Sequence, residues 1–317
     1  MGFCARPFIL CGLPLRKPSG LLYERRNGRF TLQVTGHPEF GLPFGQDRLV
    51  QIFLATLAVR QKSPIVRFGG GHEVLEMFGM AKGGKEYRRL IAAFERVFGA
   101  TIFFSSGDAA GARPVVQRAR FNFMSAATLW YSSSGCPDNE VVLTDEFYTE
   151  ISAHPIPADL EAVRVLAPSP GALDLFLWLS YRCFTAKGPE VIPLFGESGL
   201  AGQLGVVEYS RPRRFRAMLE EWLERIRSLW PGCPCRIAGE CMTIKRSAGV
   251  AVGLGSSQKF SENPGTTASD DGANPPHYGK HASSCVPLGR PLLAFLGEFG
   301  RKILTGAQRN SRKADPP

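Results

Sequence analysis

The sequence lacks the patterns that would place it in a membrane or on a secretory route. No run of about 18 apolar residues occurs, so an ordinary transmembrane helix is not expected. The apolar stretch near the N-terminus is broken by Cys11, Gly12 and Pro14, which argues against a signal peptide. The eight cysteines are scattered through a chain too long for a disulfide scaffold, and we expect them to stay reduced in a cytoplasm.

Residues that bind metals or perform catalysis are also sparse. The five histidines form no metal-binding pair, and no two of them flank a single apolar residue, as a DNA-nicking enzyme would need. Cys233, Cys235 and Cys241 lack the two-residue spacing of zinc ligands. The seven acidic residues of 136–161 have no lysine among them, which disfavours a nuclease site. We therefore expect no catalytic residues, no metal and no cofactor, and a protein that is not an enzyme.

One phosphate-binding pattern is present, but in an unsuitable context. Residues 79–86 read GMAKGGKE and satisfy G-x-x-x-x-G-K. A phosphate-binding loop also needs Ser or Thr at the next position, to hold Mg²⁺, and a strand before it. Here Glu86 follows, and the preceding residues have the spacing of a helix. We interpret the segment as a turn between two helices.

Positive charge is what the sequence has in excess. Lys and Arg number 38 against 28 Asp and Glu, which gives a formal net charge of +10 and a pI near 9.4. Such an excess indicates a polyanionic partner, either a nucleic acid or an anionic membrane surface. The basic residues concentrate in the parts of the chain that have periodic apolar residues, which favours a nucleic acid.

The length of 317 residues predicts two compact domains with extensions. Periodic apolar residues end near residue 240, where Gly, Ser, Pro and Asn become frequent, and such a composition favours disorder. In that last part 291–304 has helical spacing, which predicts a lone amphipathic helix. We predict four parts: a basic N-terminal arm (1–45), a first domain (46–133), a second domain that begins with an acidic linker (134–239), and a mostly disordered tail (240–317).

An internal repeat relates the two domains. Four segments of the first domain match four of the second in the same order, at offsets of about 122 to 128 residues. They predict a helix, a strand and two more helices, and a β-hairpin of 101–104 and 118–124 follows in the first domain. The matched pairs are 53–60 with 175–182, 65–68 with 192–195, 72–79 with 198–205, and 87–98 with 215–226.

This order of elements is typical of a winged helix. A winged helix is a helix-turn-helix with an added hairpin, and the second helix of the turn pair enters the DNA major groove. We therefore predict a mainly α fold with small β-hairpins (α+β), built from two tandem winged-helix domains. The alternative is that any two amphipathic helices can be slid into register.

Basic residues gather where such a fold would meet DNA. On a helical wheel of 86–98 the apolar residues share one face, and basic residues occupy the opposite face and its flank. In the second domain the arginines cluster at the entry to the matching helix, and the strand near residue 120 alternates basic and apolar residues, as a wing along phosphates would. For each arginine alone, the alternative is a solvated helix face. The predicted DNA-binding residues are Lys85, Arg88, Arg89, Arg96, Arg118, Arg120, Arg211, Arg213, Arg214 and Arg216.

Six long strings of the chain carry a family resemblance: FGQDRLVQIFLATLAVRQKSPIVRF, YRRLIAAFERVFGATIFF, ARFNFMS, VVLTDEFYTEISAHPIPADLEA, ALDLFLWLSYRCFTAKG and IPLFGESGLAGQLG. They resemble the plasmid-encoded RepA replication proteins of broad-host-range bacterial plasmids, over roughly residues 6–236. The resemblance implies a sequence-specific DNA-binding protein of the bacterial cytoplasm that binds double-stranded plasmid origin DNA, helps to open it and recruits host initiator or helicase proteins. After Arg236, where apolar strands of the second wing are expected, the sequence departs from the family pattern.

Other functions remain open at this point. A transcriptional repressor of the same fold, acting on its own promoter, would use the same surface. An enzyme acting on DNA is disfavoured by the missing catalytic sets, and a membrane-surface protein by the position of the basic residues. Direct repeats in the DNA and a homodimer are both compatible with an initiator.

Overall fold

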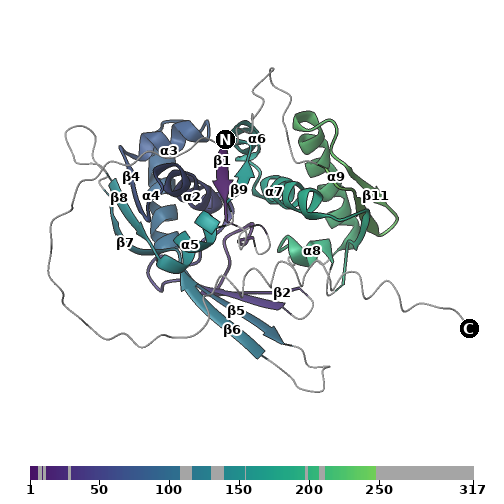
Figure 1. Ribbon diagram of the computed structural model, residues 1–317, viewed down its shortest axis with the longest axis horizontal. Helices are drawn as coiled ribbons and strands as arrows, with labels where there is room; N and C mark the ends of the chain where they lie inside the picture. Colours follow the sequence, from purple (N-terminus) through teal and green to yellow (C-terminus); the bar gives the residue numbers. More distant parts are fainter. Residues whose placement is uncertain are drawn as a thin grey trace, which may run out of the picture.

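The fold mixes helices and antiparallel sheets (Figure 1). The computed structural model describes residues 1–5, 9, 12–27, 30–107, 116–129, 139–153, 155–196, 199–206 and 211–247. Within these residues the strands form four sheets, and every strand pairing is antiparallel. None of the described helices is both long and apolar enough to span a membrane.

The first unit consists of helices packed against a three-stranded sheet. Its elements are α2 (Arg48–Gln61), β4 (Ile65–Phe68), α3 (Gly71–Met77), α4 (Gly84–Phe98), β7 (Met124–Thr128), β8 (Asn139–Leu143) and α5 (Asp145–Ala153). The strand order is β4-β8-β7, so the last strand of the unit lies between the other two. Every residue of α2 from Arg48 to Ala58 is buried, which makes this helix the centre of the unit.

The second unit has a similar succession of elements, without a counterpart of α5. They are α7 (Pro170–Thr185), β10 (Glu190–Pro193), α8 (Leu200–Gln203), α9 (Pro212–Leu229), β11 (Cys235–Ala238) and β12 (Cys241–Ile244). The strand order is β10-β12-β11, and again the last strand lies in the middle. In Figure 1 the helices α4, α2, α7 and α9 follow one another from left to right, so the two buried helices lie between the two amphipathic ones.

The four long helices were correctly predicted from apolar spacing. The segments 53–60, 87–98, 175–182 and 215–226, predicted to be helical, each lie within an observed helix. The outer helices α4 and α9 bury one face, whereas α2 and α7 are buried on nearly all sides, as expected for helices that are apolar all round. Helices are predictable in this way because their pattern is local.

The packing of α9 on α7 depends on one glycine. The indole ring of Trp222, on α9, lies against Gly171 at the start of α7. A Cβ atom on Gly171 would lie 2.0 Å from the Cζ2 atom of Trp222, so no larger residue fits while the ring keeps its place. Trp222 is buried, which agrees with its position on the apolar face of the predicted helix.

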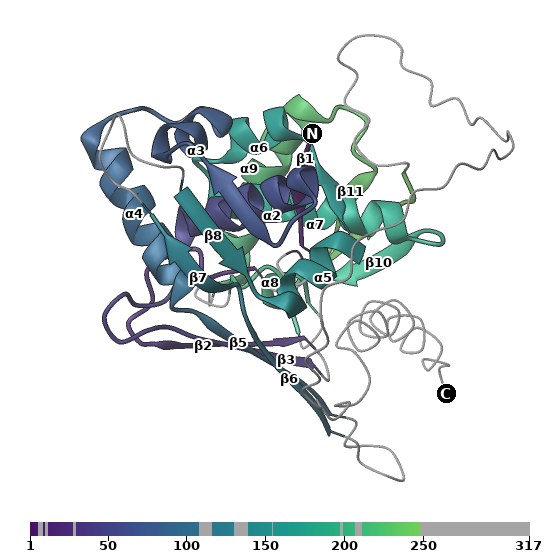
Figure 2. The same cartoon turned by 60° about the vertical axis from the view of Figure 1, so that its left-hand side comes forward.

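A four-stranded sheet projects below the helices in Figure 2. It contains the two segments that were predicted to form the β-hairpin of the first unit. It consists of β2 (Leu22–Asn27), β3 (Phe30–Thr35), β5 (Thr101–Gly107) and β6 (Val116–Asn122), in the order β2-β3-β5-β6. The segments 101–104 and 118–124 were expected to form the wing. The strands β5 and β6 do form a hairpin, but β5 also pairs with the N-terminal β3. The strands that match the β11–β12 hairpin of the second unit are instead β7 and β8.

The N-terminal residues 1–45 were expected to be a loosely attached basic arm, and the structure corrects this. The strand β1 (Gly2–Cys4) lies against α2 and pairs with β9 (Ile156–Ala158). Arg25 is only 5% exposed, and its guanidinium donates hydrogen bonds to the carbonyl oxygens of Gly12 and Gly202. Frequent Pro and Gly signalled turns between strands here, and not a detached segment.

Strand pairings also cross the boundaries predicted at residues 133 and 239. The predicted acidic linker, which begins at residue 134, contains β8, and this strand pairs with β4 and β7 of the first domain. Its acidic composition suggested solvent exposure, but Val141 and Leu143 are buried. The strand β12 lies beyond residue 239 and pairs with both β10 and β11. The predicted disorder of the tail beyond residue 247, and the helix predicted at 291–304, lie outside the described residues.

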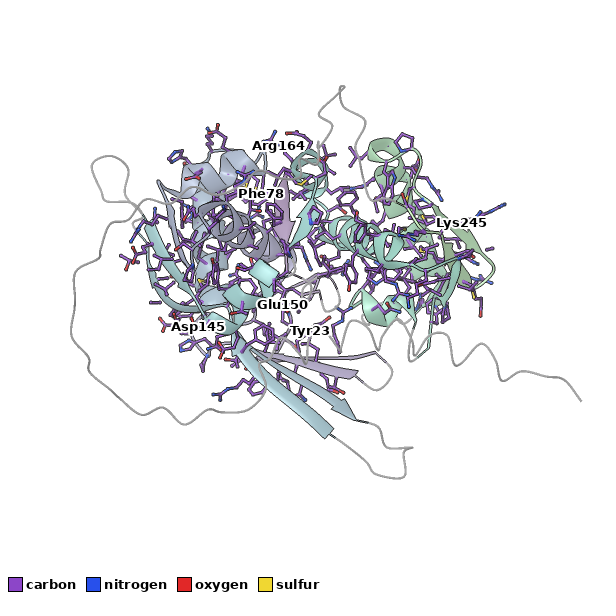
Figure 3. The ribbon with its side chains drawn as sticks, in the orientation of Figure 1. Tyr23, Phe78, Asp145, Glu150, Arg164 and Lys245 are labelled. Carbon is purple, nitrogen blue, oxygen red and sulfur yellow. The ribbon has the colours of Figure 1, made fainter. Side chains whose placement is uncertain are left out.

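A buried ion pair joins the central helices of the two units. The Nε and Nη2 atoms of Arg48, on α2, lie 2.7 Å and 2.9 Å from the carboxylate oxygens of Asp174, on α7. Burial raises the pKa of the Asp174 carboxyl, and the charges of Arg48 and Arg25 oppose this shift. Tyr23, labelled in Figure 3, adds a hydrogen bond from its hydroxyl to the carbonyl oxygen of Gly205, 3.4 Å away. The two units are therefore held in one arrangement by buried polar contacts.

Candidate nucleic-acid interface

The turn between α3 and α4 is the segment that matches the phosphate-binding pattern. The helix α3 ends at Met77 and α4 begins at Gly84, so the prediction of an interhelical turn is confirmed. Gly79 has φ of +61°, a conformation that favours glycine. The Nζ atom of Lys82 lies 2.9 Å from a carboxylate oxygen of Glu76, and this hydrogen bond lowers the pKa of the Glu76 carboxyl and raises that of the Lys82 amine. Lys82 therefore has a partner within the turn.

The helix α4 presents three of its predicted basic residues to solvent. Its buried face contains Phe94, whose ring stacks on that of Phe68 with centroids 5.9 Å apart. Lys85, Arg88 and Arg89 are exposed near the N-terminal end of the helix. The Nη1 atom of Arg89 lies 4.0 Å from the carboxylate of Glu86, and its side chain remains 60% exposed. These three residues can reach a ligand without disturbing the core.

Arg96, the fourth basic residue predicted on α4, points into the protein. Its guanidinium donates two hydrogen bonds to the carboxylate of Asp47, at 2.7 Å and 2.8 Å, and lies over the ring of Phe44. The side chain is only 17% exposed. The helical wheel placed Arg96 opposite the apolar face, but it could not show that residues before α2 cover this end of the helix. The structure gives Arg96 a role in stability.

Replacing Arg96 with alanine is therefore expected to lower the free energy of unfolding by about 1.5–3 kcal/mol, because a nearly buried carboxylate loses its charged partner. The measurement is a urea denaturation curve. Arg89→Ala, on the exposed face of the same helix, is the matched control and should change stability by less than about 0.5 kcal/mol. Equal stabilities of the two variants would show that the ion pair with Asp47 contributes nothing.

In the second unit, basic residues surround the start of α9. Arg211 is the residue that caps the helix, and Arg213 and Arg214 are exposed in its first turn. The Nε atom of Arg216 lies 4.0 Å from a carboxylate oxygen of Glu220, and its side chain is 40% exposed. Further along the helix, Glu220, Glu221 and Glu224 are exposed together with Arg225 and Arg227. The N-terminal end of α9 is therefore the part of this helix whose exposed charges are all positive.

The two predicted basic residues of β6 lie in the four-stranded sheet. Arg120 is exposed and is opposite Phe103 in the pairing of β5 with β6. Arg118 is opposite Ser105 in the same hairpin, and the position of its side chain lies outside the described residues. This hairpin follows α4 in the chain, and Arg120 places positive charge on the surface of the four-stranded sheet.

Sequence reasoning missed a basic hairpin in the second unit. Arg236 lies on β11, and Lys245 and Arg246 follow β12; all three are exposed. Figure 3 labels Lys245 at the outer edge of this hairpin. The signal was present in the alternating string CRIAGECMTI, in which Gly239 has φ of +57° at the turn. The hairpin was overlooked because the residues beyond 239 were predicted to form a disordered tail.

The described residues hold no cluster of three or more His, Cys, Asp or Glu that could bind a metal ion. The nearest approach of thiols is between Cys233 and Cys235, whose sulfur atoms lie 3.4 Å apart. A hydrogen bond from Cys233 lowers the pKa of the Cys235 thiol.

Comparison with known proteins finds a match to one family and a similar fold in solved structures. Residues 76–190 match the family described as plasmid-encoded RepA protein, which confirms the resemblance noted in the sequence. A crystal structure of domains 2 and 3 of RctB, as the selenomethionine derivative, is similar with a TM-score of 0.54 and 13% identity, over 76% of this chain and 97% of that one. A second structure of RctB domains 2–3 gives 0.51 and 14%, over 75% and 96%. No curated protein sequence matches the chain.

Proposed function

We propose that the chain initiates plasmid replication by binding origin DNA in a sequence-specific manner, because residues 76–190 match the family of plasmid-encoded RepA proteins. One observation carries the proposal. Each of the two units exposes basic residues at the N-terminal end of one amphipathic helix, α4 in the first unit and α9 in the second. The chain would bind duplex DNA without catalysing a reaction and without a cofactor.

We propose further that both units are winged helices related by an internal repeat. Support comes from the shared order of helix, strand, helix, helix and two strands, and from the shared position of the last strand between the other two. The four-stranded sheet is then an insertion between α4 and β7 in the first unit. In this arrangement α4 and α9 are the helices that enter the major groove, and the β11–β12 hairpin is the second wing.

The two types of contact would have different tasks. In a helix-turn-helix the N-terminal residues of the second helix meet base edges, so Arg89 and Arg213 are suited to reading sequence. Arg236 and Lys245, on and beside the hairpin, are suited to contacts with phosphates, which carry no sequence information. Two reading helices on one rigid chain would contact DNA segments about one helical turn, roughly 34 Å, apart.

Footprinting on the plasmid DNA that neighbours the gene tests the function itself. An initiator is expected to protect direct repeats beside an AT-rich stretch. Protection of a single inverted repeat in a promoter would favour the alternative, a transcriptional repressor that acts on its own gene. Absence of protection on any plasmid segment would contradict both. Recruitment of host initiator or helicase proteins, formation of a homodimer and a cytoplasmic location belong to the same proposal.

Affinity for duplex DNA is expected to fall steeply with salt. If the exposed basic residues neutralise about six phosphates, log K should fall with log salt at a slope of roughly −5, because bound cations are released from the DNA. Fluorescence anisotropy with a labelled duplex between low and moderate salt measures the slope. A slope near zero would contradict an electrostatic interface.

Loss of a base-reading arginine should weaken specific binding more than nonspecific binding. Arg89→Ala and Arg213→Ala are each expected to cost about 1–3 kcal/mol on the origin site. Arg236→Ala, on the hairpin, should weaken binding to origin and random DNA alike, because it removes a phosphate contact. The measurement is competition between the two DNAs. Equal losses on both DNAs for all three variants would refute the assignment of these roles.

A further inference from the structure

A large apolar groove lies between the two units, away from the basic helices. It has a volume of about 1090 Å³. Residues of α3 and of the end of α2 form one wall, and residues of β9, α6 (Leu160–Leu166) and α7 form the other. Arg164, labelled in Figure 3, bridges the walls by donating hydrogen bonds to the carbonyl oxygens of Glu76 and Met77 on α3. The DNA-binding proposal gives this groove no task.

The groove exposes apolar surface that a folded protein normally covers. Phe184, near the end of α7, is 64% exposed, and Met1 is 74% exposed. Both line the groove, together with Met77, Ile156 and Tyr181. An exposed apolar groove of this kind is typical of a site that binds one face of an amphipathic helix.

The charges of the groove nearly balance. Its lining contains four carboxylates, those of Glu73, Glu76, Asp159 and Glu161, and its positive groups are Arg60, Arg164 and the amino group of Met1. Arg164 forms an ion pair with Glu161, at 2.9 Å, and Glu76 forms one with Lys82 beside the groove, at 2.9 Å. The exposed apolar residues, and not a net charge, therefore define what can bind there.

The described chain ends beside this groove. The backbone N–H of Ser247 donates a hydrogen bond to the carbonyl oxygen of Cys183, 3.0 Å away, and Cys183 is adjacent in sequence to Phe184. The sequence that follows contains one amphipathic segment, 291–304, with apolar residues at the i, i+3, i+4, i+7 spacing that helices use to anchor in grooves. These are Leu292, Phe295, Leu296, Phe299 and Ile303.

We propose that residues 291–304 of the same chain bind in this groove as a helix. The apolar residues of the segment complement the apolar lining, whose most exposed members are Phe184 and Met1. A helix this short is marginal alone in water, and Gly297 and Gly300 weaken it further, so it would form on docking. The proposal goes beyond DNA binding and does not depend on it.

The linker between Ser247 and the segment is long enough for the segment to reach the groove of its own chain. Residues 248–290 separate the end of the described chain from the segment, and an extended chain of that length reaches more than about 100 Å. Attachment at Ser247, next to the groove, gives the segment a high effective concentration there. Weak contacts would therefore be enough to keep the site occupied.

Photo-crosslinking of the full-length chain tests the proposal. The photoreactive residue p-benzoylphenylalanine replaces Phe184, and peptide mass spectrometry maps the product. Crosslinks to 291–304 are expected in excess over those from the same residue at Val191 by on the order of tenfold. Val191 is the matched control because it is 66% exposed but lies on β10, outside the groove. Glu76, exposed on the other wall, gives a second position if the first variant does not fold.

Changes within the segment supply the decisive comparison. Phe299→Asp should reduce the crosslink from position 184 by on the order of tenfold, because it places a charge on the apolar face. Glu298→Gln, on the opposite face, should leave the crosslink unchanged. An unchanged yield with Phe299→Asp, equal crosslinking from positions 184 and 191, or products that join light and heavy isotope-labelled chains would each overturn the proposal. No DNA is present, so its failure leaves the proposed function untouched.

Discussion

Replacing Asp174 with alanine is expected to lower the free energy of unfolding by about 3–5 kcal/mol. The reason is that Arg48 stays buried on α2, with 5% of its side chain exposed, and loses the carboxylate that compensates its charge. The other partner that still receives a hydrogen bond from the Arg48 Nη2 atom is the carbonyl oxygen of Leu13, at 2.9 Å, which is neutral. Urea denaturation followed by circular dichroism measures the loss.

An exposed ion pair in the same chain provides the control. Arg67, on β4, and Glu140, on β8, are 2.7 Å apart, but their side chains are 61% and 40% exposed. Glu140→Ala should therefore cost less than about 1 kcal/mol. If Asp174→Ala were no more harmful than Glu140→Ala, the buried pair would not stabilise the junction between α2 and α7.

Ending the chain after Gly239 is expected to unfold the second unit, whereas ending it after Ser247 should preserve the unit. The shorter chain lacks β12, the middle strand of its sheet, so both β10 and β11 lose their partner. It also loses Met242 and Ile244, both fully buried, whose burial alone contributes about 3–6 kcal/mol.

Comparison of the two truncated chains separates a structural strand from a dispensable tail. Limited proteolysis should cut the shorter chain within α7 to β11 and spare the same region of the longer one. Equal resistance of both chains would contradict the pairing of β12 in this sheet. The sequence had suggested that everything beyond residue 239 is dispensable for folding, and the structure moves that limit to the end of the hairpin.

Helices could be predicted from the sequence, whereas the pairing of strands could not. Long helices such as α4 and α9 were predicted because each displays its buried face in its own local spacing. Sheet membership depends on partners that are remote in sequence. β5 reads as a strand from its own residues, but nothing local indicates that it pairs with β3, about 70 residues earlier in the chain.

The candidate interface divides in the same way. The outward position of Lys85, Arg88 and Arg89 followed from the helical wheel of α4, because exposure on an outer helix is a local property. The inward position of Arg96 did not, because Asp47 reaches it from the residue that precedes α2. The basic β11–β12 hairpin was missed for a different reason. A change in composition near residue 240 outweighed the short alternating pattern that continues past it.

The pairing of β1 with β9 has a consequence for synthesis on the ribosome. Gly2 is opposite Ala158, so the first strand to be made has to wait for a partner made more than 150 residues later. At about 5–20 residues per second, that delay is roughly 8–30 s. During this interval the edge of β1, which lies beside α2, has no paired strand. An unpaired edge of this kind can pair with a wrong strand of the nascent chain or of another chain. The start of the chain is therefore among the last parts to reach its native place.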